Sequence, residues 1–270
     1  MNVEFSKMHG AGNDFIIIDM STLPEGNLPT EKGIINLCNR KRGIGADGLI
    51  VLQKEQSDGA DFRMIFYNND GQRETMFGNG LRCASLYANR YFYDRKSLSA
   101  MTDSGLLQTE IISDNTVKIE IPCLQEFKPI CADAINLYFG NTGVPHAVLF
   151  VENNENIDVV KEGRYLRNHK AFSPKGTNVN FVSQIKGSDS IFIIRTYERG
   201  VEDETLACGT GISASAICAS LFRKAGKRII FRTKSADELT VEIPEENDLR
   251  KVFLTGPAVE VYKGLTCCQF

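Results

Sequence analysis

Two short glycine-rich stretches combine residue types that could bind an anion and move a proton. One reads Gly78-Asn79-Gly80, and the other reads Cys208-Gly209-Thr210-Gly211. Each opens a run of small and apolar residues typical of a helix, and a helix N-terminus presents unpaired backbone N–H groups with a partial positive charge. Glycine lets an anion approach that backbone closely. One such stretch alone would indicate only a helix start, but two matching ones favour a carboxylate-binding site.

Cys208 adds a reactive group to the second stretch. A thiol at a helix N-terminus is expected to have a lowered pKa, which makes it a base or a nucleophile. Removing a proton from the carbon beside a bound carboxylate puts charge on the carboxylate oxygens, and fixed N–H donors stabilise that charge. A base on one face and an acid on the other would then invert the carbon centre.

The elements that must position these stretches form two similar halves. Helices are predicted over 30–39, 79–92 and 209–222, and strands over short apolar or alternating runs, namely 16–18, 49–52, 62–67, 117–121, 147–151, 180–182, 191–194 and 239–243. The runs Glu74–Gly80 and Glu204–Gly211 resemble each other. Such an internal repeat predicts two similar α/β halves, with a boundary near 121–125.

Composition excludes several classes of protein. The chain has 270 residues, of which 42% are apolar and 24% are charged, so it can bury a hydrophobic core. Its net charge of −3 gives no indication of nucleic-acid binding. It shows neither a membrane-spanning apolar segment nor a signal peptide, which predicts a cytoplasmic protein. The eight cysteines include no Cys-x-x-Cys pair, and reduced thiols are expected.

The chain resembles the PLP-independent diaminopimelate epimerases along nearly its whole length. The resemblance rests on ordered blocks: 7–15 (KMHGAGNDF), 43–48 (GIGADG), 68–71 (NNDG), 78–83 (GNGLRC), Pro145-His146, 198–200 (ERG) and 204–211 (ETLACGTG). It implies an α/β fold of the α+β type with two pseudo-symmetric lobes. Each lobe is a curved, mostly antiparallel sheet around a central helix. The lobes would comprise residues 1–122 with about 257–270, and residues 123–256, with the active site in the cleft between them.

The same resemblance implies a function and its residues. The activity expected is that of an isomerase that interconverts LL- and meso-2,6-diaminopimelate by thiol-based proton transfer, for lysine and peptidoglycan precursor synthesis. Cys208 resembles one catalytic thiol, and His146 resembles the partner of the other. Backbone donors to the reacting carboxylate would be Gly78, Asn79, Gly209 and Thr210. Contacts to the distal end of the substrate would be Asn13, Asn68, Asn178, Glu198 and Arg199, with Glu198 also supporting Cys208.

Phe77 departs from the family pattern, because the second catalytic thiol is expected at that position. Phenylalanine cannot transfer a proton. Three readings stay open: a binding-competent variant with impaired epimerase activity, slow inversion with His146 or water as the proton carrier, or a related racemase or isomerase that uses one thiol. A non-catalytic substrate-binding homologue belongs to the first of these readings, which we favour.

No cofactor or metal site is expected. The three histidines lack metal-ligand spacing. Residues 43–48 fit Gly-x-Gly-x-x-Gly literally, but a helix is predicted before them and a strand after them, which is the wrong order for a dinucleotide site. The expected partner is a small diamino acid, and a homodimer is the default expectation for an oligomer.

Overall fold

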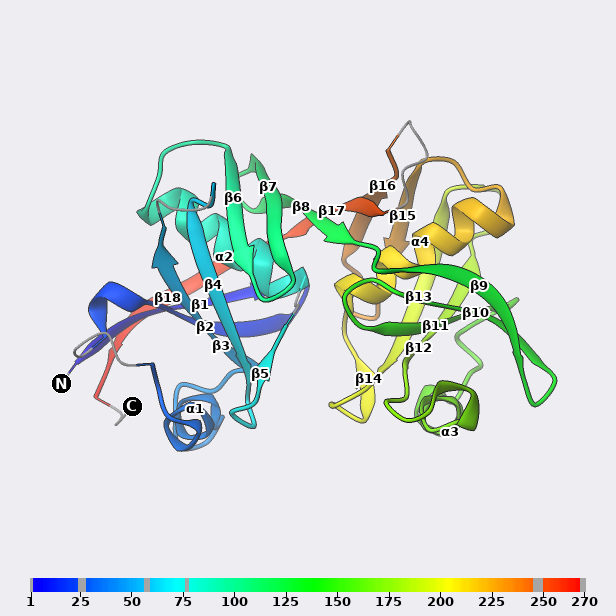
Figure 1. The fold of residues 1–270 in the computed structure, drawn as a ribbon, viewed down its shortest axis with the longest axis horizontal. Coiled ribbons are helices and arrows are strands. Elements are labelled where there is room, and N and C mark those ends of the chain that lie inside the picture. The colour runs from blue at the N-terminus through cyan, green and yellow to red at the C-terminus, as the bar shows by residue number, and fades with distance from the viewer. Residues whose placement is uncertain (1, 24–27, 56–58, 76–77, 245–249, 268–270) are drawn as a thin grey trace. The chain divides into compact units, whose positions relative to one another are not determined.

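The computed structural model describes residues 2–23, 28–55, 59–75, 78–244 and 250–267. The chain divides into two compact units: unit 1 contains residues 1–119 and 256–270, and unit 2 contains residues 120–255 (Figure 1). Phe77, the position where the second thiol is expected, lies outside the described residues.

Unit 1 is a mostly antiparallel sheet with two helices. Its strands pair in the order β18 (Val259–Thr266), β1 (Val3–Gly10), β2 (Asn13–Asp19), β3 (Gly48–Lys54), β4 (Phe62–Asn68), β6 (Ser97–Thr102), β7 (Gly105–Ser113) and β8 (Thr116–Pro122). The short β5 (Arg73–Glu74) also pairs with β4. The pairs β2/β3 and β4/β6 are parallel. The helices are α1 (Glu31–Cys38) and α2 (Gly78–Tyr91).

Unit 2 repeats this arrangement. Its strands pair in the order β9 (Gln125–Ala132), β10 (Ile135–Asn141), β11 (Pro145–Phe150), β12 (Asn178–Gln184), β13 (Ile191–Glu198), β15 (Arg228–Arg232), β16 (Glu238–Glu242) and β17 (Lys251–Pro257). The short β14 (Asp203–Thr205) pairs with β13, as β5 does with β4. The pairs β11/β12 and β13/β15 are parallel. The helices are α3 (Val159–Arg167) and α4 (Gly209–Arg223).

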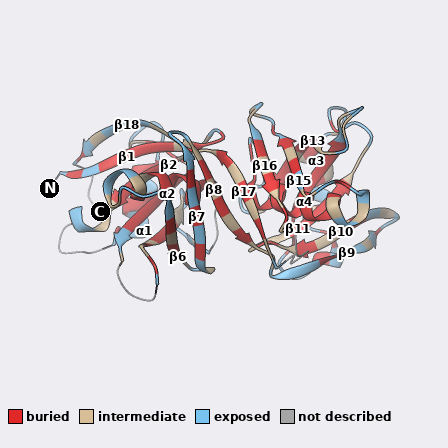
Figure 2. Cartoon of the chain, turned by 90° about the horizontal axis from the view of Figure 1, so that it is seen from above, coloured by how far each residue is buried: buried red, intermediate tan, exposed pale blue. Residues whose placement is uncertain are grey.

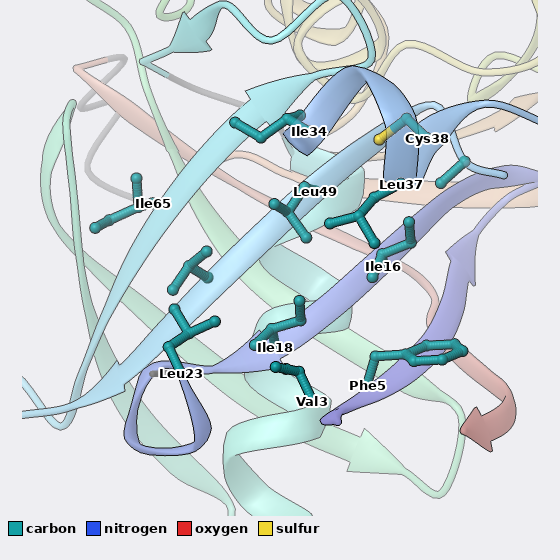
Figure 3. Close-up of a cluster of buried hydrophobic side chains, with 12 residues drawn as sticks. Val3, Phe5, Ile16, Ile18, Leu23, Ile34, Leu37, Cys38, Leu49 and Ile65 are labelled. Atoms are coloured by element: carbon teal, nitrogen blue, oxygen red, sulfur yellow. The ribbon is translucent and has the colours of Figure 1, made fainter. Parts of the chain in front are cut away.

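Each sheet has a helix packed on either face. In unit 1, α2 contacts strands from β1 to β7, so the sheet curves around it, while α1 covers the opposite face. Residues 15–18 of β2 are therefore all buried and all apolar, as a strand covered on both faces requires. Figure 3 shows the core beneath α1, where Ile34, Leu37 and Cys38 meet side chains of β1, β2 and β3. The fold predicted from the sequence, two α/β halves of matching design, is confirmed.

The central helices are buried over most of their length, and each contains many small residues. In α4, residues 209–219 are all buried, and the Ser213 and Ser215 hydroxyls donate to the carbonyls of Gly209 and Gly211. The helix ends at Lys224 in the left-handed conformation, whose N–H bonds to Ala219 O. Figure 2 shows burial along the strands of each unit, while the edge strands β9 and β18 are largely exposed.

The three predicted helices are present with slightly shifted ends, and Thr30 caps α1 by accepting from Gly33 N at 3.1 Å. Helix α3 was not predicted, because its nine residues carry few apolar side chains and only part of one face is buried. Residues 43–47 lie between α1 and β3, and Gly48 begins β3, so a helix precedes this glycine-rich run and a strand follows it, as predicted.

Candidate functional site

Cys208 stands at the N-terminus of α4, as the sequence predicted. It is the residue before the first helical turn, in extended conformation, and only 6% of its surface is exposed. Its sulfur lies 3.5 Å from the Thr210 hydroxyl, and the backbone N–H groups of Thr210 and Gly211 also bond to it. Several donors therefore converge on one sulfur atom.

The pKa of the Cys208 thiol differs from the prediction. Burial, and to a lesser extent the Glu198 carboxylate, raises the pKa to about 12, although the donors from Thr210 and Gly211 act in the opposite direction. The expectation of a lowered pKa was wrong because it counted the helix N-terminus and omitted the loss of water around the sulfur. Near pH 7 the resting protein carries a neutral thiol at this position.

His146 lies on β11 and is fully buried. Its Nε2 is 3.0 Å from Thr210 Oγ1, and its Nδ1 is 3.1 Å from Asn180 Nδ2. Burial lowers the pKa of His146 to about 3, and the positive charge of Arg199 contributes. The imidazole is therefore neutral. These contacts connect His146, through Thr210, to Cys208 in its own unit, whereas the resemblance pairs it with the other thiol.

Asn178 joins two segments at one end of β12. Its Nδ2 donates to Pro145 O at 3.0 Å, and its Oδ1 accepts from the backbone N–H of Arg199 at 2.8 Å. This fixes the backbone just after Glu198, the last residue of β13. The structure thus places Asn178 beside the backbone of Glu198 and Arg199, and the field of Glu198 reaches Cys208.

In unit 1 the predicted residues Asn13 and Asn79 are in contact. Asn79 lies in the first turn of α2 and its Nδ2 donates to Asn13 Oδ1 at 3.3 Å. Arg82, which is fully buried, donates to Asn79 Oδ1 at 2.9 Å and to Pro257 O at 3.1 Å. The second half of the Asn13 amide donates to Asp47 Oδ2 at 2.6 Å. A donor-only guanidinium and an acceptor-only carboxylate thus orient both amides between them.

Asp47 belongs to an ionic cluster behind Asn13. Arg40 forms bonds of 3.0 and 2.6 Å to both oxygens of Asp14 and one of 2.7 Å to Asp47, and Lys7 pairs with Asp14 at 2.7 Å. Burial would raise the pKa of Asp14, but the hydrogen bonds from Arg40 and Lys7 hold it well below its usual range. The cluster anchors the β1–β2 turn that carries Asn13.

The remaining predicted residues lie at the ends of elements. Asn68 closes β4, where its N–H bonds to Gln72 O at 2.9 Å and its register partner is Gly48. Gly78 and Gly209 are the first residues of α2 and α4. The sequence reading missed Arg82, Asp47 and Asn180. For Asn180 a signal existed, because it is a polar residue inside the otherwise buried strand β12.

Neither a metal site nor a membrane-spanning helix is found in the described part of the chain. No group of three or more histidine, cysteine or acidic side chains there is placed to hold a metal ion. No helix in the same residues is long and apolar enough to cross a membrane.

Comparison with known proteins identifies relatives over nearly the whole chain. The family model described as diaminopimelate epimerase matches residues 5–121 and 138–261. A diaminopimelate epimerase of Aquifex aeolicus is 39% identical and covers 97% of this chain and 97% of its own. One from Hydrogenobaculum sp. is 40% identical and covers 96% and 97%.

A solved structure shares the fold at much lower identity. The phenazine biosynthesis protein of the PhzF family from Bacillus anthracis superimposes with a TM-score of 0.74 at 16% identity, covering 98% of this chain and 99% of its own. The family model and the curated relatives decide the assignment. The chain belongs to the diaminopimelate epimerase family.

Proposed function

We propose that this protein is a cofactor-independent isomerase that interconverts LL- and meso-2,6-diaminopimelate. The observation that carries the proposal is Cys208 at the N-terminus of α4, with a hydroxyl and two backbone N–H groups directed at its sulfur. The names of the curated relatives supply the substrate. The reaction is removal of a proton from one α-carbon and delivery of a proton to it.

The donors at the two helix starts support such a reaction. Loss of the α-proton leaves negative charge that spreads onto the neighbouring carboxylate, and donors that already point there lower the barrier. We propose Gly78 and Asn79 in unit 1 and Gly209 and Thr210 in unit 2 as the donors to this carboxylate.

The distal end of the substrate would be held by polar residues that the two units place at strand ends. Asn13, Asn68, Asn178 and Arg199 are proposed to bind the distal carboxylate and ammonium, with Glu198 as the anionic partner of the ammonium. A planar guanidinium can meet a carboxylate with two parallel bonds. An ammonium beside Glu198 would also reduce the negative field that Glu198 exerts on Cys208.

Cys208 would serve one face of the α-carbon. The Cys208 thiol first loses its proton to solvent, and the thiolate then takes the α-proton. The thiol formed in that step returns a proton to the carbanion on the same face. Inversion also needs a group on the opposite face, and Phe77 has no ionisable group. We therefore expect exchange on the Cys208 face to be faster than net inversion.

Phe77 also favours a second candidate function, which is binding of the diamino acid without turnover. In that case the residues that bind the two ends of the substrate are retained and the reaction is lost. Ligand would then raise the melting temperature of the protein while the α-carbon stays unlabelled.

The deciding experiment incubates the purified protein with LL-diaminopimelate in D2O. NMR reads α-deuterium uptake, and chiral chromatography reads inversion. We expect uptake, and we expect Cys208→Ala to reduce it by about 100-fold or more. Cys218→Ala, which removes another buried thiol of the same helix, is the matched control and should retain uptake.

Absence of uptake in the wild-type protein, with stabilisation by the ligand, would replace the isomerase with the binding function. Absence of both would exclude diaminopimelate as the ligand. The cytoplasmic location and the homodimer expected from the sequence remain predictions, and light scattering of the same sample tests the second.

A further inference from the structure

A chain of buried polar side chains leads from the centre of the unit 2 sheet to Cys208. It runs through Thr196 on β13, Asn180 on β12, His146 on β11 and Thr210 on α4. None of these residues is more than 5% exposed. Buried polar groups are costly unless each is paired, so the direction of every hydrogen bond in the chain is constrained.

The donor and acceptor of each hydrogen bond can be assigned from a backbone carbonyl, which can only accept. Asn180 presents one end of its amide to Ala147 O at 3.0 Å, and that end must therefore be the nitrogen. The other end, Oδ1, accepts from Thr196 Oγ1 at 3.0 Å. The second hydrogen of the amide nitrogen then faces His146 Nδ1 at 3.1 Å, and Nδ1 must accept it.

The bond accepted at Nδ1 also determines which nitrogen of the neutral His146 imidazole donates. A neutral histidine that accepts at Nδ1 carries its hydrogen on Nε2. His146 Nε2 therefore donates to Thr210 Oγ1 at 3.0 Å. The Thr210 hydroxyl accepts this bond and turns its own hydrogen elsewhere, and Cys208 Sγ lies 3.5 Å away. Thr142 keeps the turn in place by donating to Thr210 O at 3.0 Å.

We propose that Asn180 and His146 are positioning residues that hold the Thr210 hydroxyl as a hydrogen-bond donor to the Cys208 sulfur. The bond stabilises the thiolate that forms when Cys208 gives up its proton. This role rests on the proposed function of Cys208 as the proton-transfer group, but the hydrogen-bond arrangement itself does not. His146 thus acts through Thr210 and touches no reacting atom.

The surroundings explain why such a device is needed. Burial and the Glu198 carboxylate both disfavour the thiolate of Cys208. Burial keeps the His146 imidazole neutral, and the positive charge of Arg199 acts in the same direction. The hydrogen-bonded series Thr196, Asn180, His146 and Thr210, called the relay below, is neutral. It can therefore orient the Thr210 hydroxyl without adding a charge beside Cys208. Gly211 lets Asn180 approach closely, because a Cβ there would overlap Asn180 Oδ1.

The first test reads the tautomer of His146 in the wild-type protein without substrate. Nitrogen-15 NMR distinguishes a protonated Nε2 from a protonated Nδ1, and the chain has only three histidines to assign. We expect His146 to keep its hydrogen on Nε2 between pH 6 and pH 8. A hydrogen on Nδ1 would overturn the proposal.

The second test measures the rate at which iodoacetamide alkylates Cys208, followed by peptide mass spectrometry across a pH series. Thr210→Val removes the hydroxyl and keeps the shape, so we expect about tenfold slower alkylation at fixed pH. Thr210→Ser retains the hydroxyl and should restore the rate. The exposed Cys131 in the same sample is the internal control, and its rate should not change.

The same assay tests the two positioning residues. His146→Leu should slow Cys208 alkylation as Thr210→Val does, while His146→Gln, which keeps an N–H donor near the Nε2 position, should not. Adding Asn180→Leu to Thr210→Val should cause no further slowing, because both act through one hydroxyl. A wild-type rate in Thr210→Val, or fully additive effects, would contradict the relay. No substrate is involved, so failure of the relay is distinguishable from failure of the proposed activity.

Discussion

The two units place different chemistry at the same register positions beneath their central helices. In each unit a parallel pair of strands begins at matching points, with Phe15 opposite Gly48 in unit 1 and His146 opposite Asn178 in unit 2. Two residues further along, the next strands align Ile50 with Phe66, and Asn180 with Thr196. The apolar set of unit 1, Phe15, Ile50 and Phe66, therefore corresponds to the polar set of unit 2, His146, Asn180 and Thr196.

This difference separates stability from chemistry in one repeated fold. Phe15 and Phe66 form an edge-to-face ring contact with centroids 6.0 Å apart, which stabilises unit 1 through burial and ring packing. The polar set of unit 2 gains less from burial and must pair every donor and acceptor. This pairing directs the Thr210 hydroxyl towards the Cys208 sulfur. The corresponding positions in the described strands of unit 1, Phe15, Ile50 and Phe66, are all apolar.

The largest expected effect comes from giving unit 1 the thiol that unit 2 has. We expect Phe77→Cys to raise net inversion of LL-diaminopimelate by about 10²- to 10⁴-fold, because it supplies a proton-transfer group for the second face. Chiral chromatography measures inversion, and Phe77→Ala is the control that removes the ring without adding a thiol. Equal rates in the two variants would mean that bulk, and not the missing thiol, limits inversion.

Truncating the apolar set should affect stability without affecting Cys208. Phe66→Ala should lower the free energy of unfolding by about 3–5 kcal/mol, through lost burial and a cavity, and leave Cys208 alkylation unchanged. The matching change in unit 2, Thr196→Val, should cost about 1–3 kcal/mol, since Asn180 Oδ1 loses its donor. Urea denaturation gives both values. A larger cost for Thr196→Val would contradict the division between the two units.

The smallest effect is a pH dependence of stability that comes from His146, whose counterpart in unit 1, Phe15, cannot titrate. The folded pKa of His146, about 3, lies below the value of about 6.5 in the unfolded chain, so below pH 6.5 the unfolded state binds the extra proton. Stability from His146 is complete above that pH and falls by about 1.4 kcal/mol per pH unit as the pH drops towards 3. At pH 5 the loss is about 2 kcal/mol.

Urea denaturation of the wild type and His146→Gln at pH 7 and pH 5 isolates this contribution, because other groups titrate equally in both proteins. We expect the wild type to lose about 2 kcal/mol more than the variant between these pH values. Equal losses would show that His146 can be protonated inside the fold, which the buried relay does not allow.

Much of the fold could be predicted because each strand signal is local. The run Ile16-Ile17-Ile18 lies within β2 as predicted, and the apolar alternation around Leu239 marks β16. The first turns of α2 and α4 follow from their glycine-rich starts. Helix α3 was missed because few of its side chains are apolar and because its packing depends on Gly163, where a Cβ would overlap Tyr197 on β13. No local pattern reveals such a contact.

Several residues of the candidate site could be predicted from the sequence, but the hydrogen bonds between them could not. The resemblance named Cys208, His146 and Thr210, and the structure brings these three together. It could not name Asn180 or Thr196, because their role depends on the pairing of three strands. The thiol pKa was misjudged for a similar reason, since burial is a property of the whole unit.

The strand pairing also sets the order in which the units can be completed during translation. Unit 2 is one continuous segment, residues 120–255, whereas unit 1 needs β18 to pair with β1, joining Val3 to Thr266. While the ribosome synthesises unit 2, the edge of β1 that β18 later covers has no partner from its own sheet. Unit 2 can thus fold first although it is encoded second, and the unit that begins the chain is the last to close.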